Sequence, residues 1–184
     1  MSEWFETPEG TERRVWQTLG RGLADRRAPA RHPVLATRGV EAGAEARVVV
    51  LRGVDAEARL LKVHTDVRSG KITELRADPA CALLIWDAKA NLQIRLRALA
   101  EVIVGDAAIW ARIPPGAQRV YGGSPTPGAR LGDPQNHEPD AILEAFARIV
   151  LEVQEIETLH LGPDLHRRAR FERSSDWTGT WLAP

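Results

Sequence analysis

Apolar and polar residues alternate along much of the chain, and a period of two is the spacing of a β-strand with one buried face. The clearest example is the segment 91–104, in which apolar residues hold every second position and Gln93, Arg95 and Arg97 stand between them. One face of this strand is therefore expected to pack on a core and the other to be polar. From the pattern alone, the polar face can meet either plain solvent or a polar ligand.

The segment 47–71 carries the densest combination of strand, turn and helix signals. It begins with a β-branched run that has an arginine at each end, made up of Arg47, Val48, Val49, Val50, Leu51 and Arg52. This composition predicts a buried strand whose cationic ends emerge from the sheet. Turn residues follow over 53–59, and the segment 60–65 is apolar again, so the two runs predict an antiparallel hairpin.

A helix is predicted directly after this hairpin, because Ser69 is a suitable N-cap and a proline after Asp78 stops the helix. The backbone N–H groups at a helix N-terminus attract anions. Arg47, Arg68 and Lys71 are expected within reach of these groups. We therefore predict a phosphate site where the strand meets the helix.

The remaining pattern predicts further strands at 32–37, 80–86, 146–153, 156–161, 168–173 and 177–182. Helices are expected within residues 1–30, after Asp106 and over 140–145, and the Gly- and Pro-rich segment 114–139 is expected to be a lid or dimer-contact loop. The total is about eight mostly antiparallel strands. This count is typical of a mainly β fold, a small β-barrel with helices, in a single domain of 184 residues.

Composition narrows the classes of function. The 25 basic and 25 acidic residues give a formal net charge of zero, so no attraction to nucleic acid or to an anionic membrane is expected. We interpret the arginines within residues 1–30 as a solvated helix face. Cys81 stands alone in an apolar run and permits no internal disulfide. Without a signal-peptide pattern or an apolar run near the ~20 residues of a membrane span, the chain is expected to be soluble and cytoplasmic.

The sequence offers no metal site and no recognisable catalytic side chain. Its five histidines form no pair at the spacing of helical zinc ligands. Gly-x-Ser-x-Gly, Walker-type and Gly-x-Gly-x-x-Gly loops do not occur in it either. What remains is a phosphate site beside a polar strand face, which suits a phosphorylated ligand. Catalytic residues stay unassigned.

Several short motifs occur in the order found in one protein family. They are Arg-x-x-x-Leu-Arg at 47–52, Thr-x-x-x-Ser-x-Lys at 65–71, Gln93 in the next long strand, and Arg170-Phe171 followed by Trp181-Leu182-Ala183-Pro184. This set resembles the pyridoxamine 5′-phosphate oxidase-like family of flavin mononucleotide (FMN) binding split barrels, over residues 33–184. The resemblance implies an FMN-binding split barrel that forms a homodimer, with FMN at the subunit interface.

The resemblance also implies roles for individual residues. The FMN phosphate would be bound by Arg47 and Lys71, with Thr65, Arg68 and Ser69 nearby. The isoalloxazine ring would lie along the strand formed by Val48, Val49, Val50 and Leu51, which ends at Arg52. His64 would stand beside the phosphate residues, Gln93 would reach the cofactor across the dimer interface, and Arg170 would lie near the ring.

The positions for a substrate depart from the family pattern. Gly70 stands where the family has an arginine in its phosphate loop, and Arg68 is the proposed substitute. The family's substrate-binding Arg-x-His is replaced by the segment 166–170, and its substrate-phosphate residues have no counterpart over 109–121. We expect a small anionic substrate, with pyridoxamine or pyridoxine phosphate as one option, bound by His166, Arg167 and Arg168.

Two other functions stay open beside an FMN-dependent oxidoreductase. The changed substrate positions also suit a non-catalytic protein that binds FMN or another phosphorylated ligand. A heme-handling relative on the same barrel is the third option. Turnover, ligand binding without turnover, and a heme absorption band would separate the three.

Overall fold

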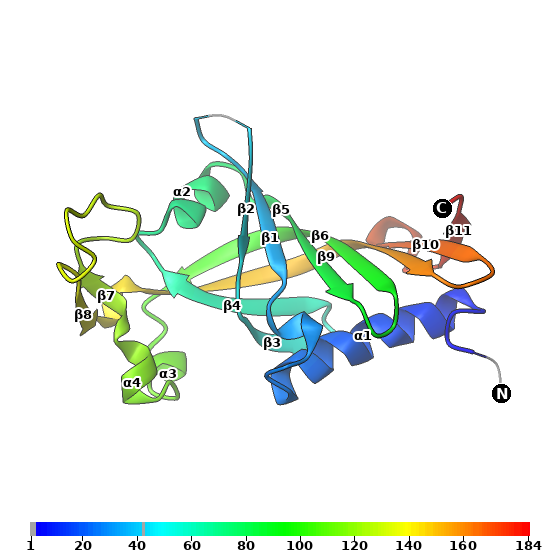
Figure 1. Cartoon of the computed structure of the whole chain (residues 1–184), viewed down its shortest axis with the longest axis horizontal. Coiled ribbons are helices and arrows are strands. Elements are labelled where there is room, and N and C mark those ends of the chain that lie inside the picture. The colour runs from blue at the N-terminus through cyan, green and yellow to red at the C-terminus, as the bar shows by residue number, and fades with distance from the viewer. Residues whose placement is uncertain (1–2, 42) are drawn as a thin grey trace.

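The computed structural model describes residues 3–41 and 43–184 and is mostly β, with helices around a large antiparallel sheet (Figure 1). The strands are β1 (Val34–Arg38), β2 (Ala44–Val48), β3 (Leu51–Asp55), β4 (Leu60–Asp66), β5 (Ala80–Asp87), β6 (Leu92–Val104), β7 (Val120–Ser124), β8 (Glu138–Ala141), β9 (Phe146–Leu161), β10 (His166–Glu172) and β11 (Thr180–Leu182). The helices are α1 (Pro8–Ala24), α2 (Gly70–Ala77), α3 (Ala107–Trp110) and α4 (Pro115–Gln118), with short turns η1 (Pro29–Arg31), η2 (Leu143–Ala145) and η3 (Arg173–Ser175). No helix in the described ranges is both long and apolar enough to cross a membrane.

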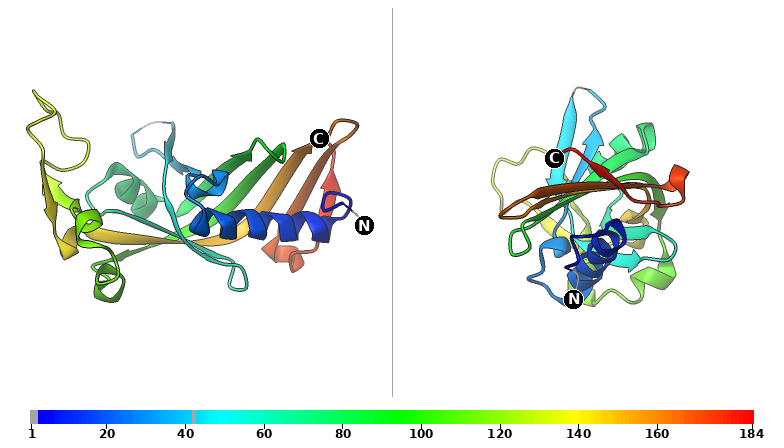
Figure 2. Two further views of the ribbon diagram at one scale, coloured as in Figure 1. Left: turned by 60° about the horizontal axis from the view of Figure 1, so that its bottom comes forward. Right: turned by 90° about the vertical axis from the view of Figure 1, so that its right-hand side faces the viewer.

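Two long strands, β6 and β9, form the middle of the sheet. They pair along their length, from Leu92 opposite His160 to Val104 opposite Ala147. The other edge of β9 is divided between two partners, because β4 pairs with residues 146–152 and β10 with residues 155–161. The sheet therefore splits along β9. One branch leads to β3 and β4, and the other extends to β10 and β11 at the far end of the molecule (Figures 1 and 2).

The segment 44–55 closes the first branch into a barrel. Its first part, β2, pairs with β1, and its second part, β3, pairs with β4. Between the two, the Val49 N–H donates to the carbonyl of Pro33 at 2.9 Å, so the chain changes partners within the barrel wall. The single buried strand predicted for 47–52 is therefore wrong: Val48 is 63% exposed, whereas Val49 is buried. Strand propensity does not report which strand a residue pairs with.

The predicted alternation along β6 is confirmed. Leu92, Ile94 and Leu96 are fully buried in the core, and the face that carries Gln93 and Arg95 stays polar and partly exposed. α1 packs against β3 and β10, and α2 packs against β1 and β6 (Figure 2). α2 thus covers the barrel beside β1, and it brings its N-terminus to the end of β4.

Four other predicted elements differ from the structure. The two strands predicted over 146–161 form one strand, because a bulge carries β9 past the polar residues between its apolar runs. The segment 114–139 contains α4 and β7 and is not a continuous loop. The helix predicted over 140–145 is replaced by the end of β8 and the turn η2. The last strand begins only at Thr180, because Asp176 and Trp177 have left-handed backbone conformations that cannot continue a strand.

Candidate functional site

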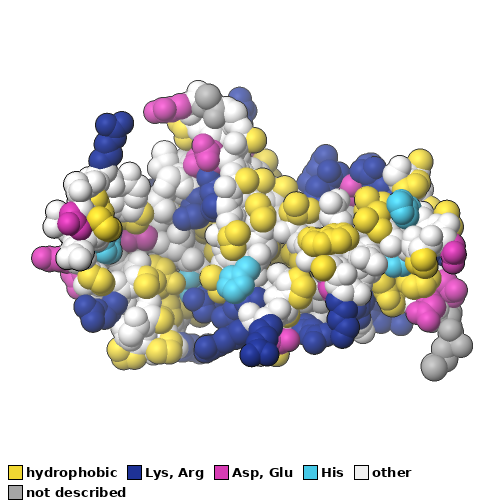
Figure 3. Space-filling view, viewed as in Figure 1, with side chains coloured by type: hydrophobic (Ala, Val, Ile, Leu, Met, Phe, Trp, Pro, Cys, Tyr) yellow, Lys and Arg dark blue, Asp and Glu magenta, His cyan; other side chains and the backbone are white. Residues whose placement is uncertain are grey.

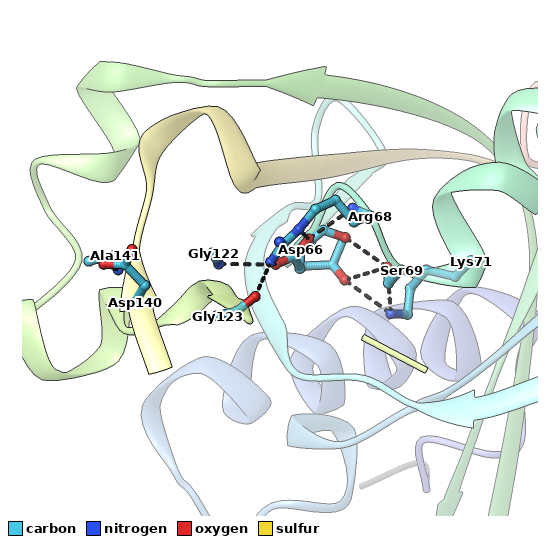
Figure 4. Close-up of polar contacts among 9 residues, drawn as sticks. Asp66, Arg68, Ser69, Lys71, Gly122, Gly123, Asp140 and Ala141 are labelled. Carbon is cyan, nitrogen blue, oxygen red and sulfur yellow. Dashed lines mark hydrogen bonds and ion pairs between the residues drawn. The ribbon is translucent and has the colours of Figure 1, made fainter. Parts of the chain in front are cut away.

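The polar side chains of the β4–α2 loop (residues 65–71) converge on one another (Figure 4). The Lys71 ammonium donates to the hydroxyl of Thr65 at 3.0 Å and to the hydroxyl of Ser69 at 3.1 Å. These two hydroxyl oxygens lie 3.2 Å apart, and both residues are buried. The loop therefore presents one cation and two hydroxyls as a single polar cluster.

Ser69 holds the N-cap position of α2, as predicted, but its side chain does not cap the helix. Its hydroxyl instead donates to the carbonyl of Asp66 at 2.7 Å. The N–H groups in the first turn of α2 therefore receive no hydrogen bond acceptor from a capping side chain, and they carry the partial positive charge of the helix N-terminus.

Two of the three cations predicted for a phosphate site, Arg47 and Lys71, lie close together. Burial lowers the pKa of Lys71, and the positive charge of Arg47 lowers it further, while Glu74 and Asp66 act in the opposite direction. Arg47 lies 2.9 Å from the Glu74 carboxylate and donates to the hydroxyl of Thr37. Among the described residues, no carboxylate lies within ion-pair distance of Lys71. Its half-buried ammonium thus has neutral hydroxyl partners, and an anion would stabilise its charge.

Asp66 fastens this loop to β7 (Figure 4). One carboxylate oxygen accepts from the Arg68 backbone N–H at 2.8 Å and from its Nε at 2.9 Å. The other accepts from Arg68 Nη2 at 2.7 Å and from the Gly122 N–H at 3.0 Å. Arg68 Nη2 also donates to the carbonyl of Gly123 at 2.9 Å. Arg68 therefore holds the loop against β7, a use of its guanidinium that the sequence did not suggest.

Gly122 makes this attachment sterically possible. Its φ of 123° is unfavourable for residues with a side chain, and a Cβ at this position would lie 2.7 Å from Ile142 Cβ. A glycine here lets the backbone N–H reach Asp66. Tyr121, the residue before it, is consequently fixed beside the loop.

A concave site lies against the outer side of β3, β4 and β9, and we call it the cationic pocket. It has a volume of about 380 Å³. Its polar lining comprises Arg52, Lys62, His64, Arg112, Tyr121 and Arg148. The register explains part of this set, because His64 pairs directly with Arg148 and Lys62 pairs with Gly53. The segment between α3 and β7 supplies the facing wall.

Neutral imidazole is the resting form of His64 in this pocket. Burial lowers the pKa of His64 to about 4, with further lowering by the charges of Arg52 and Arg148, against a smaller opposing effect of Asp106. The ring also contacts Phe146 edge-on, with centroids 5.1 Å apart. Burial raises the pKa of Tyr121, and the nearby Arg52 opposes part of that rise. The pocket is thus electropositive, and its histidine is uncharged at neutral pH.

The face of β6 that carries Gln93 continues across the neighbouring strands. Three guanidinium groups meet the buried carboxylate of Glu157: Arg95 at 2.8 Å, Arg168 at 2.7 Å and Arg170 at 3.4 Å. Burial alone would raise the pKa of Glu157, but these arginines hold it below its ordinary value. One carboxylate is therefore the ion-pair partner of three arginines, and the cluster has an excess of positive charge.

The structure does not bring the predicted substrate residues His166, Arg167 and Arg168 into one cluster. Arg168 faces Glu157, whereas Arg167 lies over the ring of Phe5 at 4.8 Å from its centroid. Neighbouring residues of a strand point to opposite faces of the sheet, so a consecutive trio cannot act on one ligand from one side. Within the described residues, moreover, no group of three or more His, Cys, Asp or Glu side chains is placed to hold a metal ion.

Sequence reasoning missed Asp66, Lys62, Arg112, Tyr121 and Arg148. A signal existed for Lys62, because it alternates with the buried Leu61 on the same side of β4 as His64. The contribution of Arg112 and Tyr121 depends on how the segment 107–121 folds back over the sheet. That arrangement has no local sequence signature.

The barrel that splits along β9, with α2 packed beside β1, has the architecture of the split-barrel class of folds. A family model described as the pyridoxamine 5′-phosphate oxidase, FMN-binding domain, matches residues 13–104, half of the chain. The chain belongs to this family. A search of curated proteins found no match.

Solved structures show the same fold. A pyridoxamine 5′-phosphate oxidase-related, FMN-binding protein from Nostoc punctiforme PCC 73102 is 21% identical, with a TM-score of 0.76 over 93% of this chain and 96% of that one. PhzG from Burkholderia lata 383, solved with tetrahydrophenazine-1-carboxylic acid, is 22% identical, with a TM-score of 0.76 over 100% and 97%. General Stress Protein 26 from Bacillus anthracis str. Sterne is 16% identical, with a TM-score of 0.53 over 91% and 98%. At these identities the likeness concerns the fold.

The attachment through Asp66 leads to a test by pH. Burial alone would raise the pKa of Asp66, but the hydrogen bonds from Arg68 and Gly122 outweigh burial, so folding lowers this pKa. Its stabilisation is present above the unfolded-state pKa of 3.8 and is lost as the pH falls through the lower folded-state pKa. Asp66→Asn should reduce the free energy of unfolding by about 2 kcal/mol at pH 7, and the difference should shrink in acid. Urea unfolding across this pH range measures it.

Asp164→Asn is the matched control, because Asp164 is exposed on the β9–β10 turn. It should unfold like the parent at every pH. Equal stability of Asp66→Asn and the parent at pH 7 would contradict the role given to Asp66.

Proposed function

We propose that the chain is a flavoprotein that binds FMN through its phosphate at the β4–α2 loop. The carrying observation is the half-buried Lys71 ammonium, which donates to Thr65 and Ser69 and lies near Arg47. The residues present fit a phosphate, since two cations, two hydroxyls and the uncapped start of α2 are the donors that bind dianions in proteins.

The predicted residues of the β4–α2 loop and of the segment 47–51 have the following roles in this proposal. Arg47 and Lys71 would neutralise the phosphate charge, and Thr65 and Ser69 would hydrogen-bond to its oxygens. The chain from Val48 to Leu51, which crosses from β2 to β3, would offer backbone groups to the ring. The bound flavin would supply the redox chemistry, and the protein would supply binding and orientation.

Arg47 has ion-pair partners in this proposal both before and after a phosphate binds. In the structure its guanidinium is held by Glu74 and Thr37, and the Glu74 side chain is only 11% exposed. This ion pair keeps the guanidinium oriented towards α2 when no anion is bound. Glu45 is a second carboxylate partner, 3.6 Å from Arg47. A phosphate would add a third negative partner without requiring Arg47 to leave the other two, because a guanidinium has five N–H donors.

A homodimer would complete the site. Residues directly opposite each other in neighbouring strands share a face of the sheet, and the pairings place Val48, Leu84, Arg95 and Arg170 in one row. Leu84 is 40% exposed in this row, and Trp86 beside Gln93 is 46% exposed. Figure 3 shows hydrophobic side chains gathered over the region of β1 and β5. An exposed apolar strip beside surplus arginines is suited to a second copy that brings its own Gln93 and Arg170 to the cofactor.

FMN titration tests the phosphate assignment. Lys71→Met should weaken FMN binding about 10- to 100-fold, because a charge-assisted hydrogen bond contributes roughly 1.5–3 kcal/mol. Binding of riboflavin, which lacks the phosphate, should change little in this variant. Flavin fluorescence and equilibrium dialysis measure both affinities.

Arg38→Met provides the control, because the Arg38 side chain is 79% exposed on β1. It should bind FMN like the parent. A parent protein that takes up no FMN would refute the proposal, and equal losses for FMN and riboflavin in Lys71→Met would refute the phosphate assignment.

The proposed dimer can be tested independently by measuring the molar mass of the protein in solution. Leu84→Glu combined with Trp86→Glu should halve the mass measured by light scattering, since burying two new carboxylates at the interface is costly. FMN affinity should fall with it, because each site would lose its partner residues. Leu23→Glu changes an apolar residue that is 37% exposed on α1, outside the strip, and should leave the mass unchanged. A parent protein with the mass of one chain would contradict the dimer.

A further inference from the structure

We propose that a groove between α1 and the β5–β6 turn (residues 88–91) binds a nucleoside polyphosphate. We call this site the α1 groove. Its volume is about 890 Å³, larger than that of the cationic pocket. None of the residues that line it belongs to the proposed phosphate site or to the cationic pocket. The α1 groove is therefore a separate site, and its ligand does not depend on the proposed flavoprotein function.

One face of α1 forms the long wall of the α1 groove. Arg14, Thr18 and Arg21 are spaced four and three residues apart, so they lie on the same side of the helix, and all three line the groove. Arg14 and Arg21 are about 10 Å apart along the helix axis, since a helix rises about 1.5 Å per residue. Cations spaced in this way favour an extended ligand with several polar groups over a single small anion.

The α1 groove has more positive charge than the chain neutralises. Its charged lining residues are Arg14, Arg21, Arg27, Lys89, Asp25 and Asp87. Of the four cations, Arg21 alone has an ion-pair partner among the described residues, Asp25 at 3.7 Å. Asp25 also accepts from the Arg27 backbone N–H at 2.8 Å, and Asp87 accepts from the backbone N–H of Lys89 at 3.1 Å. Both carboxylates are thus already hydrogen-bonded, and a ligand with several negative charges would supply the missing partners.

Neutral polar groups of the α1 groove also lack partners. Thr18 is 7% exposed, and its hydroxyl has no hydrogen-bond partner within the described chain. Buried hydroxyls are normally hydrogen-bonded, so this one indicates a polar ligand. Gln17 and Asn91 line the groove too, and the described residues provide no partner for their side-chain amides. A hydroxyl and two amides suit the sugar hydroxyls and the base edge of a nucleoside.

Aromatic rings line one end of the α1 groove. Phe5 stacks on His160 with ring centroids 4.6 Å apart, and Trp4 meets the same imidazole at 4.9 Å. Burial lowers the pKa of His160, and neighbouring positive charges lower it further, so this ring is neutral at pH 7. The Arg14 guanidinium lies over the Trp4 ring, 5.5 Å from its centroid. Aromatic rings and guanidinium planes are the surfaces on which proteins stack nucleobases.

These features assign one part of the ligand to each part of the groove. The base would lie at Trp4 and Arg14, and the phosphates would extend towards Arg21 and Arg27. Cations alone bind carboxylates as well as phosphates. The combination of a stacking end, neutral hydrogen-bonding groups and several unpaired cations is what favours a nucleoside polyphosphate.

Calorimetry with ATP, adenosine and tripolyphosphate tests the proposal, in protein saturated with FMN and in protein without it. ATP should bind at one site per chain and at least about tenfold more tightly than either of the other two compounds, because it alone uses both ends of the groove. Tripolyphosphate binding as tightly as ATP would show a non-specific attraction of polyanions and overturn the proposal. Absence of ATP binding would overturn it as well.

Variants locate the binding. Arg21→Gln should weaken ATP binding about tenfold and leave adenosine binding unchanged, whereas Trp4→Leu should weaken both. Arg13→Gln is the matched control, because Arg13 is an exposed arginine of α1 that does not line the groove. An equal loss of ATP affinity in Arg13→Gln and Arg21→Gln would contradict the assignment. The comparison of ATP with tripolyphosphate in the parent decides the question even if a variant does not fold.

The α1 groove and the flavin site can be told apart. Lys71→Met should leave ATP affinity unchanged, and saturating FMN should not displace ATP. Loss of ATP binding in either experiment would place ATP at the β4–α2 loop and refute the α1 groove. FMN binding without ATP binding would refute the α1 groove alone, and ATP binding by a protein that takes up no FMN would refute the flavoprotein alone.

Discussion

The buried carboxylate of Asp66 is the interaction on which the candidate site depends. The carboxylate accepts hydrogen bonds from Arg68 and from Gly122, and the backbone carbonyl of Asp66 accepts one from the Ser69 hydroxyl. A buried carboxylate must be fully hydrogen-bonded, so the β4–α2 loop and β7 are held at a fixed separation. The loop can then present the Lys71 ammonium and its hydroxyl partners to an anion, while β7 carries Tyr121 into the cationic pocket.

The barrel supplies the second constraint. β9 pairs with β6 along one edge and divides its other edge between β4 and β10. The proposed phosphate site and the cationic pocket belong to the β4 side of this division. Gln93 on β6 and Arg170 on β10 belong to the other side, on a face of the sheet that is partly exposed. Within one chain these groups do not meet, which is the physical reason for proposing a second copy.

Much of the fold could be predicted from the sequence. The alternation along β6 gave the correct buried face, because burial of one side of a strand leaves a pattern with a period of two. Ser69 was placed correctly as the N-cap because its residue type and spacing report a helix start. The division of the run 47–52 between β2 and β3 could not be predicted, since both halves favour strands and the pairing partner is a long-range property.

The candidate site, too, could be predicted only where its residues lie close together in the sequence. Lys71, Thr65 and Ser69 lie within seven residues, so local sequence was enough to place them together. The contact between Asp66 and Gly122 joins residues 56 positions apart, and the cationic pocket collects side chains from β3, β4, β9 and the segment 109–121. The consecutive trio at 166–168 looked like an anion site in the sequence, but strand geometry sends its members to different faces.

The most direct test of the account is a crystal structure of the protein grown with FMN. The account predicts that phosphate oxygens lie about 3 Å from Lys71 Nζ and from the hydroxyls of Thr65 and Ser69, with Gln93 of a second chain beside the flavin. A structure in which the phosphate lies elsewhere, and Lys71 keeps its present hydroxyl partners alone, would contradict it.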